Sequence, residues 1–371
     1  MKLYITGCYG TGNAGDEAIL SSLIQLAEEH YQSPDILVGS TNPEYTEQLH
    51  NVSSVRTIEK SPKTILKIIN NVDRILIGGG SIIGADFVRR HAVLVAMANI
   101  FNIPVGYISA GIAGTEFEDL RKECIKNMDY ILVRDHISKK EVKEIVPNCE
   151  VITVPDPVFC PPAEPHSKPS DVDIESIEIV VCGRYVNYRD APFDLDDLAT
   201  ALDGINRHVT LVPMHYRSDK EFCEDLANIS DSDMNVINKE LTFREVNYLI
   251  SKAELVVGVR LHSIIMAIQN KTPFVGISYH RKCKALLQDY GIERIHNYDR
   301  IEPSFIKADV SEQLATNSNY INNYQKEKNE ELNTLFNIIE RIKNTSKKKE
   351  ASLGLYRLTI YSFLLFIFEN N

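Results

Sequence analysis

The sequence lacks the features that mark several classes of protein. Glycine, proline and cysteine number only 18, 15 and 7 among 371 residues, which excludes a collagen-like chain, a disulfide scaffold and a low-complexity disordered chain. Basic residues are also in short supply, with 40 Lys and Arg against 51 Asp and Glu and a net charge of −11. A broad nucleic-acid-binding face needs clustered positive charge, so no nucleic-acid partner is expected. A small basic pocket for an anion is compatible with this balance.

Motifs for metal, redox or covalent chemistry are missing as well. The seven cysteines form no CxxC pair, and neither HExxH, G-x-S-x-G nor a Walker A lysine occurs. We therefore expect free thiols in a reducing cytosol, no metal and no cofactor.

Neither end of the chain carries a long apolar run. Residues 2–6 are predicted to be a strand and lack the apolar core of a signal peptide, so a cytoplasmic location is expected. Three lysines at 347–349 precede a mostly apolar stretch over 353–368, which is shorter than the ~20 residues of a spanning helix. Two interpretations are open: residues 347–368 contact the inner face of the membrane peripherally, or they form a last helix docked on the protein.

What the sequence does contain is a regular alternation of short apolar runs and amphipathic stretches. In the first half, strands are predicted at 2–6, 35–38, 74–77, 105–109, 130–133 and 151–154, and helices at 17–31, 65–70, 89–101 and 120–127. In the second half, strands are predicted at 178–182, 209–213, 235–237, 255–259 and 274–277, and helices at 195–205, 219–229, 242–252, 263–270, 282–290 and 311–343. This alternation is typical of parallel sheets covered by helices on both faces.

The predicted fold class is α/β, with two Rossmann-like domains whose parallel sheets face a central cleft. We expect an N-terminal domain over residues 1–160, a linker over 161–176, a C-terminal domain over 177–305 and a helical tail over 306–371. The linker is predicted from four prolines within residues 161–170. Because α/β folds bind ligands at the carboxyl ends of their strands, these ends are where functional residues are sought.

The turn after the first predicted strand carries a GxGxxG pattern over residues 10–15, as in a dinucleotide-binding fingerprint. That fingerprint also needs an acidic residue at the end of the second strand, whereas Asp35 lies at its beginning. Asp16 and Glu17 follow the last glycine, where they would compete with a pyrophosphate. The pattern therefore favours a structural turn over an NAD site. In that turn Asp16 would cap the helix, and the glycines would permit close approach of another segment or a ligand.

Four groups of short segments occur in order along the chain: Gly10-x-Gly12-Asn13-x-Gly15-Asp16-Glu17-Ala18-Ile19-Leu20; Ile77-Gly78-Gly79-Gly80-Ser81; Val133-Arg134-Asp135-x-x-Ser138 with Asp156-Pro157; and Val259-Arg260-Leu261-His262-Ser263 with Gly276-Ile277-Ser278-Tyr279 and Lys282. Together they resemble the polysaccharide pyruvyl transferase family. The resemblance implies a GT-B-like pair of domains, with the acceptor bound on the N-terminal side and the donor on the C-terminal side. It implies phosphoenolpyruvate as donor, a sugar acceptor (nucleotide sugar, lipid-linked oligosaccharide or glycan) of the cell envelope or capsule, and a pyruvyl ketal and phosphate as products.

Phosphoenolpyruvate is a small, highly charged anion, so its binding needs several cations in one pocket, and Arg is preferred for bidentate contacts. Arg260 and His262 follow the predicted strand at 255–259 and precede the predicted helix at 263–270, where a helix N-terminus favours an anion. By resemblance, Arg260 binds the donor and His262 is the general acid. Arg184 follows the strand at 178–182 and is the second anion ligand that the family suggests. The alternative is structural: a capping histidine and an arginine in an ion pair.

Neighbouring turns supply the remaining candidates. His215, after the strand at 209–213, and Lys282 are candidate donor contacts, with a loop histidine and a solvated helix start as their structural alternatives. Asn13, Asp16 and Gly80 are candidate acceptor-side residues. Arg134 and Asp135 could bind a ligand or form a structural ion pair, and the structural pair is slightly favoured.

Two other functions stay open. A GT-B nucleotide-sugar glycosyltransferase or epimerase would need a carboxylate for the ribose in the second domain, and Glu254 lies at the wrong end of its strand for that role. A non-catalytic scaffold of glycan assembly is the third hypothesis. The joint presence of Arg184, Arg260 and His262 argues against it.

Overall fold

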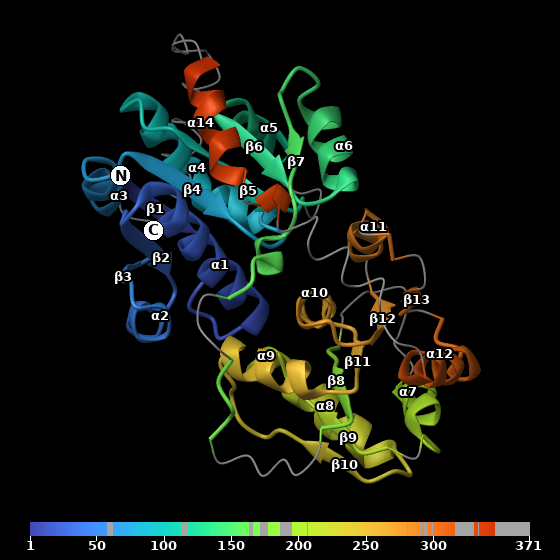
Figure 1. Cartoon of the computed structure of the whole chain (residues 1–371). Helices are drawn as coiled ribbons and strands as arrows, with labels where there is room; N and C mark the ends of the chain where they lie inside the picture. Colours follow the sequence, from blue (N-terminus) through green and yellow to red (C-terminus); the bar gives the residue numbers. More distant parts are fainter. Residues whose placement is uncertain are drawn as a thin grey trace, which may run out of the picture. The chain divides into compact units, whose positions relative to one another are not determined.

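The protein folds into two compact units, each built on one parallel sheet (Figure 1). The computed structural model describes residues 1–57, 62–112, 118–162, 166–170, 177–185, 195–205, 207–279, 281–289, 291–292, 295–298, 300–315, 330–332 and 334–345. The first unit comprises Met1–Thr11, Ile19–Pro157 and Glu331–Asn371, and the second comprises Gly12–Ala18 and Val158–Glu330. The predicted class of two Rossmann-like α/β domains is therefore confirmed. The short segment after the first strand is counted in the second unit, and the C-terminal segment in the first.

In the first unit, seven parallel strands are ordered β3-β2-β1-β4-β5-β6-β7 within the described residues. They are β1 (Lys2–Thr6), β2 (Asp35–Ser40), β3 (Ser53–Arg56), β4 (Arg74–Gly78), β5 (Val105–Ala110), β6 (Tyr130–Val133) and β7 (Ile152–Thr153). The helices are α1 (Ala14–Tyr31), whose first turn is counted in the second unit, and α2 (Pro43–His50), α3 (Pro62–Ile69), α4 (Ala85–Ile100), α5 (Glu118–Lys126), α6 (His136–Ile145) and α14 (Leu335–Thr345).

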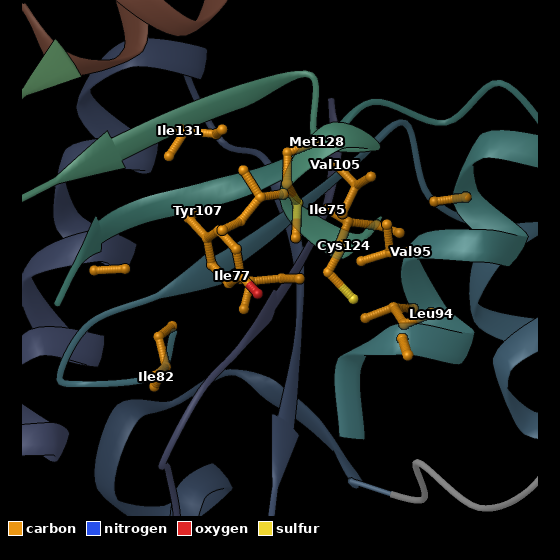
Figure 2. Close-up of a cluster of buried hydrophobic side chains, with 14 of the residues drawn as sticks. Ile75, Ile77, Ile82, Leu94, Val95, Val105, Tyr107, Cys124, Met128 and Ile131 are labelled. Atoms are coloured by element: carbon orange, nitrogen blue, oxygen red, sulfur yellow. The ribbon is translucent and has the colours of Figure 1, made fainter. Parts of the chain in front are cut away.

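The first core forms because the central strands are apolar on both faces. Every residue of β4 and β5 is buried, as expected where helices cover both sides of a parallel sheet. Figure 2 shows Ile75 and Val105 from these strands grouped with Leu94 and Val95 of α4 and with Cys124 of α5. Burial of one such aliphatic side chain contributes about 1.5–3 kcal/mol, so the cluster holds the sheet and its helices together.

In the second unit, six parallel strands are ordered β10-β9-β8-β11-β12-β13 within the described residues. They are β8 (Ile179–Cys182), β9 (Val209–Leu211), β10 (Met234–Val236), β11 (Leu255–Gly258), β12 (Phe274–Ser278) and β13 (Ile295–Asn297). The helices are α7 (Leu195–Leu202), α8 (Tyr216–Ile229), α9 (Phe243–Lys252), α10 (Leu261–Asn270), α11 (Arg281–Asp289) and α12 (Pro303–Ala315), and a 3₁₀ turn, η1 (Pro157–Phe159), follows β7.

The structure adds elements that the hydrophobic pattern did not predict: α2, α6, β3 and β13. The two helices are polar and bury only two residues each, so they show no apolar stripe. The stretch over 311–343 was expected to be helical throughout. Of its described parts, 311–315 lie in α12, 330–332 are helical and 335–343 lie in α14, and residues 316–329 are outside the described residues.

The apolar stretch at 353–368, like the whole segment 347–368 considered for membrane contact, also lies outside the described residues. In the part of the chain that the structure describes, no helix is long and apolar enough to cross a bilayer.

Helix α14 lies against the rest of the first unit (Figure 1), and a buried arginine pairs with it. Arg74, at the start of β4, has a side chain that is only 1% exposed, and its Nη2 lies 3.1 Å from Oε1 of Glu340 in α14. The Tyr31 hydroxyl donates to the same Glu340 oxygen at 2.8 Å. Phe336 stacks on His30 with 5.5 Å between ring centroids. The buried arginine is thus paired with a carboxylate from a helix more than 250 residues further along the chain.

Replacing Glu340 by Gln should destabilise the first unit, because the buried Arg74 charge loses its counter-ion. Breaking a fully buried pair costs about 3–5 kcal/mol, and since Glu340 is 35% exposed we expect about 1–3 kcal/mol of unfolding free energy. Urea denaturation measures this change. Asn337→Ala, at an exposed position of the same helix, is the control and should stay within about 0.5 kcal/mol. Equal stabilities of the Gln variant and the wild type would show that the pair does not hold α14.

Candidate functional site

The topology of the second sheet marks one position as a ligand-binding edge. From β8 the chain moves outward to β9 and β10, and it then returns to the other side of β8 and continues through β11, β12 and β13. Ligands of open α/β sheets bind at the carboxyl ends of the strands where the order reverses, which here is between β8 and β11. Arg184 follows β8 and Arg260 follows β11. The two predicted anion ligands therefore lie on either side of this reversal.

Arg184 also lies close to the end of β12, the strand beyond β11 in the sheet. Its guanidinium carbon is 5.9 Å from the centroid of the Tyr279 ring, and its Nε donates to the carbonyl of Tyr185 at 3.2 Å. Burial raises the pKa of the Tyr279 hydroxyl, and the positive charges of Arg184 and Arg260 oppose this rise. The ends of three adjacent strands thus bring two guanidinium groups and one phenol close enough together for the two positive charges to act on the phenol.

Arg260 is the N-cap residue of α10 and is 8% exposed. Its Nε donates to Oδ2 of Asp219 at 2.9 Å, and its Nη2 donates to Oγ of Ser218 at 2.8 Å and to Oδ1 of Asp219. Asp219 is fully buried. The ion pair considered as a structural alternative is therefore present, although it lies in the interior rather than on the surface. It occupies one edge of the guanidinium.

His262 lies inside α10 and not, as the sequence suggested, between a strand and a helix that begins at Ser263. The helix begins at Leu261, so His262 is in its first turn. Its ring packs directly over Gly15: a Cβ on Gly15 would lie 2.4 Å from Nδ1 and 2.6 Å from Cγ of His262. Because real Cβ atoms do not approach other heavy atoms so closely, only glycine fits at this position without a shift.

The rest of the glycine-rich segment, Gly12–Ala18, also packs within the second unit. The Ala14 N–H donates to the carbonyl of Met214 at 2.8 Å, just after β9. Gly12, with a φ of +77°, lies against the carboxylate of Glu240, which follows β10. The predicted close approach of another chain segment to these glycines is therefore observed.

Asn13 and Asp16 stabilise the start of α1. The side-chain oxygen of Asn13 accepts from the Gly15 N–H at 3.2 Å, and its Nδ2 donates to Oδ2 of Asp16 at 2.7 Å. Asn13 thus binds the backbone N–H of the first turn, the role that the sequence assigned to Asp16. Both side chains belong to the same unit as Arg260 and His262.

His215 joins the network around Arg260. It is the N-cap residue of α8, its backbone N–H donates to Oδ2 of Asp219 at 3.0 Å, and its Nδ1 lies 3.0 Å from Oγ of Ser218. The structure therefore brings Arg184, Arg260, His262 and His215 to the carboxyl edge of one sheet.

Two candidates do not join this group. Gly80 belongs to the first unit, where its carbonyl accepts from the Gly111 N–H at 2.7 Å and its φ is +68°. Lys282 lies in α11, and its side chain is outside the described residues.

The Arg-Asp-x-x-Ser segment has a structural role in the first unit. Arg134 and Asp156 are both buried and form an ion pair at 3.4 Å, so Arg134 is in a structural ion pair, although its partner is Asp156 and not the adjacent Asp135. Asp135 caps α6 by accepting from the Ser138 N–H at 2.6 Å. Glu254 precedes β11, and its carboxylate is 3.4 Å from Nη1 of Arg207, so it lies at the end of the strand opposite to Arg260, as predicted.

Asp219 is a residue of the site that was not predicted from the sequence. A signal for it existed, because the buried residues of α8 are Asp219, Phe222, Cys223 and Leu226, the spacing of one helix face. A carboxylate on an otherwise apolar face is rarely tolerated without a cation beside it. Among the described residues, no group of three or more His, Cys, Asp or Glu side chains could hold a metal ion.

The two parallel-sheet units define a protein of the GT-B class, and solved structures agree. HepE from Anabaena in complex with UDP-glucose matches with a TM-score of 0.61, 12% identity and coverage of 93% of this chain and 99% of the other. UDP-GlcNAc 2-epimerase from Methanocaldococcus jannaschii matches with a TM-score of 0.59, 14% identity and coverage of 92% and 100%. UDP-GlcNAc 2-epimerase from Neisseria meningitidis bound to UDP-GlcNAc matches with a TM-score of 0.56, 13% identity and coverage of 93% of this chain and 100% of the other. At such low identity these likenesses establish the fold.

The family follows from the sequence match. The family model for polysaccharide pyruvyl transferase matches residues 13–281, well over half of the chain. This protein belongs to the polysaccharide pyruvyl transferase family, as the ordered motifs indicated.

Replacing Gly15 by Ala tests the contact with His262. In an unobstructed helix this change should stabilise the protein by up to about 1 kcal/mol. Because the added methyl group would overlap the His262 ring, we expect a loss of about 1–3 kcal/mol instead, measured by thermal unfolding. The same substitution in a His262→Ala background is the control and should cost less, since most of the overlapping ring atoms are gone. A stabilised Gly15→Ala variant would mean that the ring does not pack there.

Proposed function

We propose that this protein transfers the pyruvyl group of phosphoenolpyruvate onto two hydroxyls of one sugar in a cell-envelope or capsular glycan precursor, forming a pyruvyl ketal and releasing phosphate. The acceptor would be a nucleotide sugar, a lipid-linked oligosaccharide or a glycan. For a lipid-linked acceptor the reaction would take place at the inner face of the membrane, with residues 347–368 as the candidate contact.

One observation carries the proposal: in a chain of the polysaccharide pyruvyl transferase family, Arg184 and Arg260 flank the reversal of strand order in the second sheet. Phosphoenolpyruvate carries a carboxylate and a phosphate, and paired arginines suit both groups. Helix α10 begins directly after Arg260, and its N-terminus adds a partial positive charge. Since Asp219 neutralises part of this charge, the helix N-terminus and Arg184 supply the further positive charge that a donor with a carboxylate and a phosphate needs.

The proposed reaction begins with protonation of the enol. A proton adds to the CH₂ carbon, this carbon becomes a methyl group, and the adjacent carbon gains oxocarbenium character. One sugar hydroxyl attacks that carbon and loses its proton, and a second hydroxyl then displaces phosphate, again with loss of a proton. Two C–O bonds to the sugar form and the C–O bond to phosphate breaks. No oxidant, reductant or covalent intermediate is required.

His262 is proposed as the general acid for the first step. Histidine is the side chain most often used as a general acid, because its imidazole ring can hold and deliver a proton. Its place in the first turn of α10 puts it two residues from Arg260, beside the proposed phosphate position. The contact with Gly15 would hold the ring in one orientation.

Calorimetric titration with phosphoenolpyruvate tests the donor. Wild type should bind it saturably, and Arg184→Ala should bind about 10- to 100-fold more weakly, because a charge-assisted contact contributes about 1.5–3 kcal/mol. Arg184 is preferable to Arg260 for this test, since removal of Arg260 leaves the fully buried Asp219 carboxylate unpaired. Lys252→Ala, at an exposed position in the last turn of α9, is the control for loss of a cation.

Titration with a UDP-sugar separates the alternatives. Binding of the UDP-sugar without any response to phosphoenolpyruvate, also after preincubation with the UDP-sugar, would overturn the proposed donor in favour of a glycosyltransferase or epimerase. Silence towards both ligands would favour the non-catalytic scaffold.

His262→Ala should separate catalysis from binding. We expect phosphate release from phosphoenolpyruvate, measured with a panel of UDP-sugars as acceptors, to fall by about 10²- to 10⁴-fold in kcat. The dissociation constant for the donor should change by less than about threefold, because the proton is needed only in the transition state. Equal losses of turnover and donor affinity would instead identify His262 as a binding group.

A further inference from the structure

The buried carboxylate of Asp219 pairs with Arg260, although none of the motifs found in the sequence contains it. It lies in the first turns of α8 and is fully buried. It accepts hydrogen bonds from Nε and Nη2 of Arg260, from the backbone N–H of His215 and from the hydroxyl of Ser218. One side chain thereby joins the turn after β9 to the turn after β11.

These contacts fix which edge of Arg260 is available. A guanidinium has five N–H groups in a rigid plane. Asp219 and Ser218 take up the Nε–H and Nη2 edge. In the part of the chain that the structure describes, Nη1 has no hydrogen-bond partner, and two N–H groups remain on that side for a ligand. Because the plane is rigid, holding one edge determines where the other edge points.

A site built only to attract anions would not contain this carboxylate. Asp219 cancels the charge of Arg260 and is itself desolvated, so it weakens the long-range attraction for a phosphate. Its benefit must therefore lie in geometry. An arginine that is already fixed loses less conformational freedom when the ligand binds, and preorganisation of this kind increases affinity.

We propose that Asp219 is the positioning residue of the donor site: it holds the Nε and Nη2 edge of Arg260 so that the Nη1 edge is presented to the donor phosphate. This inference rests on the proposed function for the identity of the donor. Asp219 itself does not touch the donor. It acts through Arg260, and through the His215 backbone it couples this arginine to the start of α8.

Asp219→Asn tests the proposal with little change in shape. The amide nitrogen would face an Arg260 N–H group and break the bidentate pairing, so phosphoenolpyruvate binding measured by calorimetry should weaken at least 10-fold. If Asp219 only cancels charge, the same variant should bind the donor more tightly, and that result would overturn the proposal, as would an unchanged affinity. Glu224→Gln removes a carboxylate from the exposed face of the same helix, where Glu224 pairs with Lys220, and should leave the affinity unchanged.

A double-mutant cycle separates positioning from general damage to the fold. If Asp219 acts through Arg260, Asp219→Asn should cause no further loss of affinity in an Arg260→Met background. If the two substitutions lower the affinity by factors that multiply, Asp219 has a role independent of Arg260 and the inference is overturned.

The Arg260 Nε–H resonance in ¹⁵N-correlated NMR, identified by its absence in Arg260→Met, gives a readout without ligand. It should exchange slowly with water in the wild type and at least 10-fold faster in Asp219→Asn, and equal exchange rates would contradict the proposed hold.

Parallel titrations with inorganic phosphate keep the two proposals apart. A wild-type protein that binds phosphate but not phosphoenolpyruvate would overturn the proposed donor, while the dependence of phosphate binding on Asp219 would still decide the positioning role. A wild-type protein that binds phosphoenolpyruvate with the same affinity after Asp219→Asn would leave the proposed function standing and remove the positioning role.

Discussion

Parallel pairing of β8 with β11 is the constraint on which the site depends. Parallel strands all end at the same edge of a sheet, so each turn that follows a strand delivers its residues to that edge. Because the chain places β9 and β10 on one side of β8 and β11, β12 and β13 on the other, residues far apart in sequence become neighbours there. Arg184 and Arg260 are 76 positions apart, yet both charges act on Tyr279. Their convergence is a consequence of topology rather than of any local motif.

Two buried arginines in this protein show how the same electrostatic requirement serves different ends. An arginine withdrawn from water needs a carboxylate, since the desolvation penalty is several kcal/mol without one. Arg74 forms an ion pair with Glu340, and this pair attaches a helix distant in sequence to the first sheet. Arg260 forms an ion pair with Asp219, and this pair leaves one edge of the guanidinium without a protein partner among the described residues. Buried ion pairs contribute little net stability compared with apolar packing, so what distinguishes these two is what they position.

The fold and part of the site were predictable from the sequence, and the reasons are specific. The strands β1 and β6 were predicted to the residue because each is a short run with an apolar interior, Leu-Tyr-Ile between Lys2 and Thr6 in β1 and Tyr-Ile-Leu-Val in β6. Arg260 and His262 were found through an ordered set of motifs. Asp219 was not predicted, because its partner lies 41 positions away, and a carboxylate on an apolar helix face indicates a nearby cation without identifying it. The start of α10 was misplaced by two residues since its N-cap is an arginine without a capping side-chain bond, and the usual Ser, Thr, Asp or Asn signal is missing.

The glycine-rich turn shows why a pattern of glycines does not by itself identify a ligand. In a dinucleotide site, the glycines of GxGxxG let the backbone approach a pyrophosphate. Here the same spacing meets protein atoms: Gly12 faces the Glu240 carboxylate, and Gly15 faces the His262 ring. The requirement for a missing Cβ is identical in both cases, so sequence spacing cannot distinguish them. The acidic pair Asp16 and Glu17 does distinguish the two cases, because a helix start that carries two carboxylates disfavours a phosphate and suits a neighbouring imidazole. We infer that in this chain the glycines position the proposed general acid, and that the phosphate is bound at the start of α10 instead.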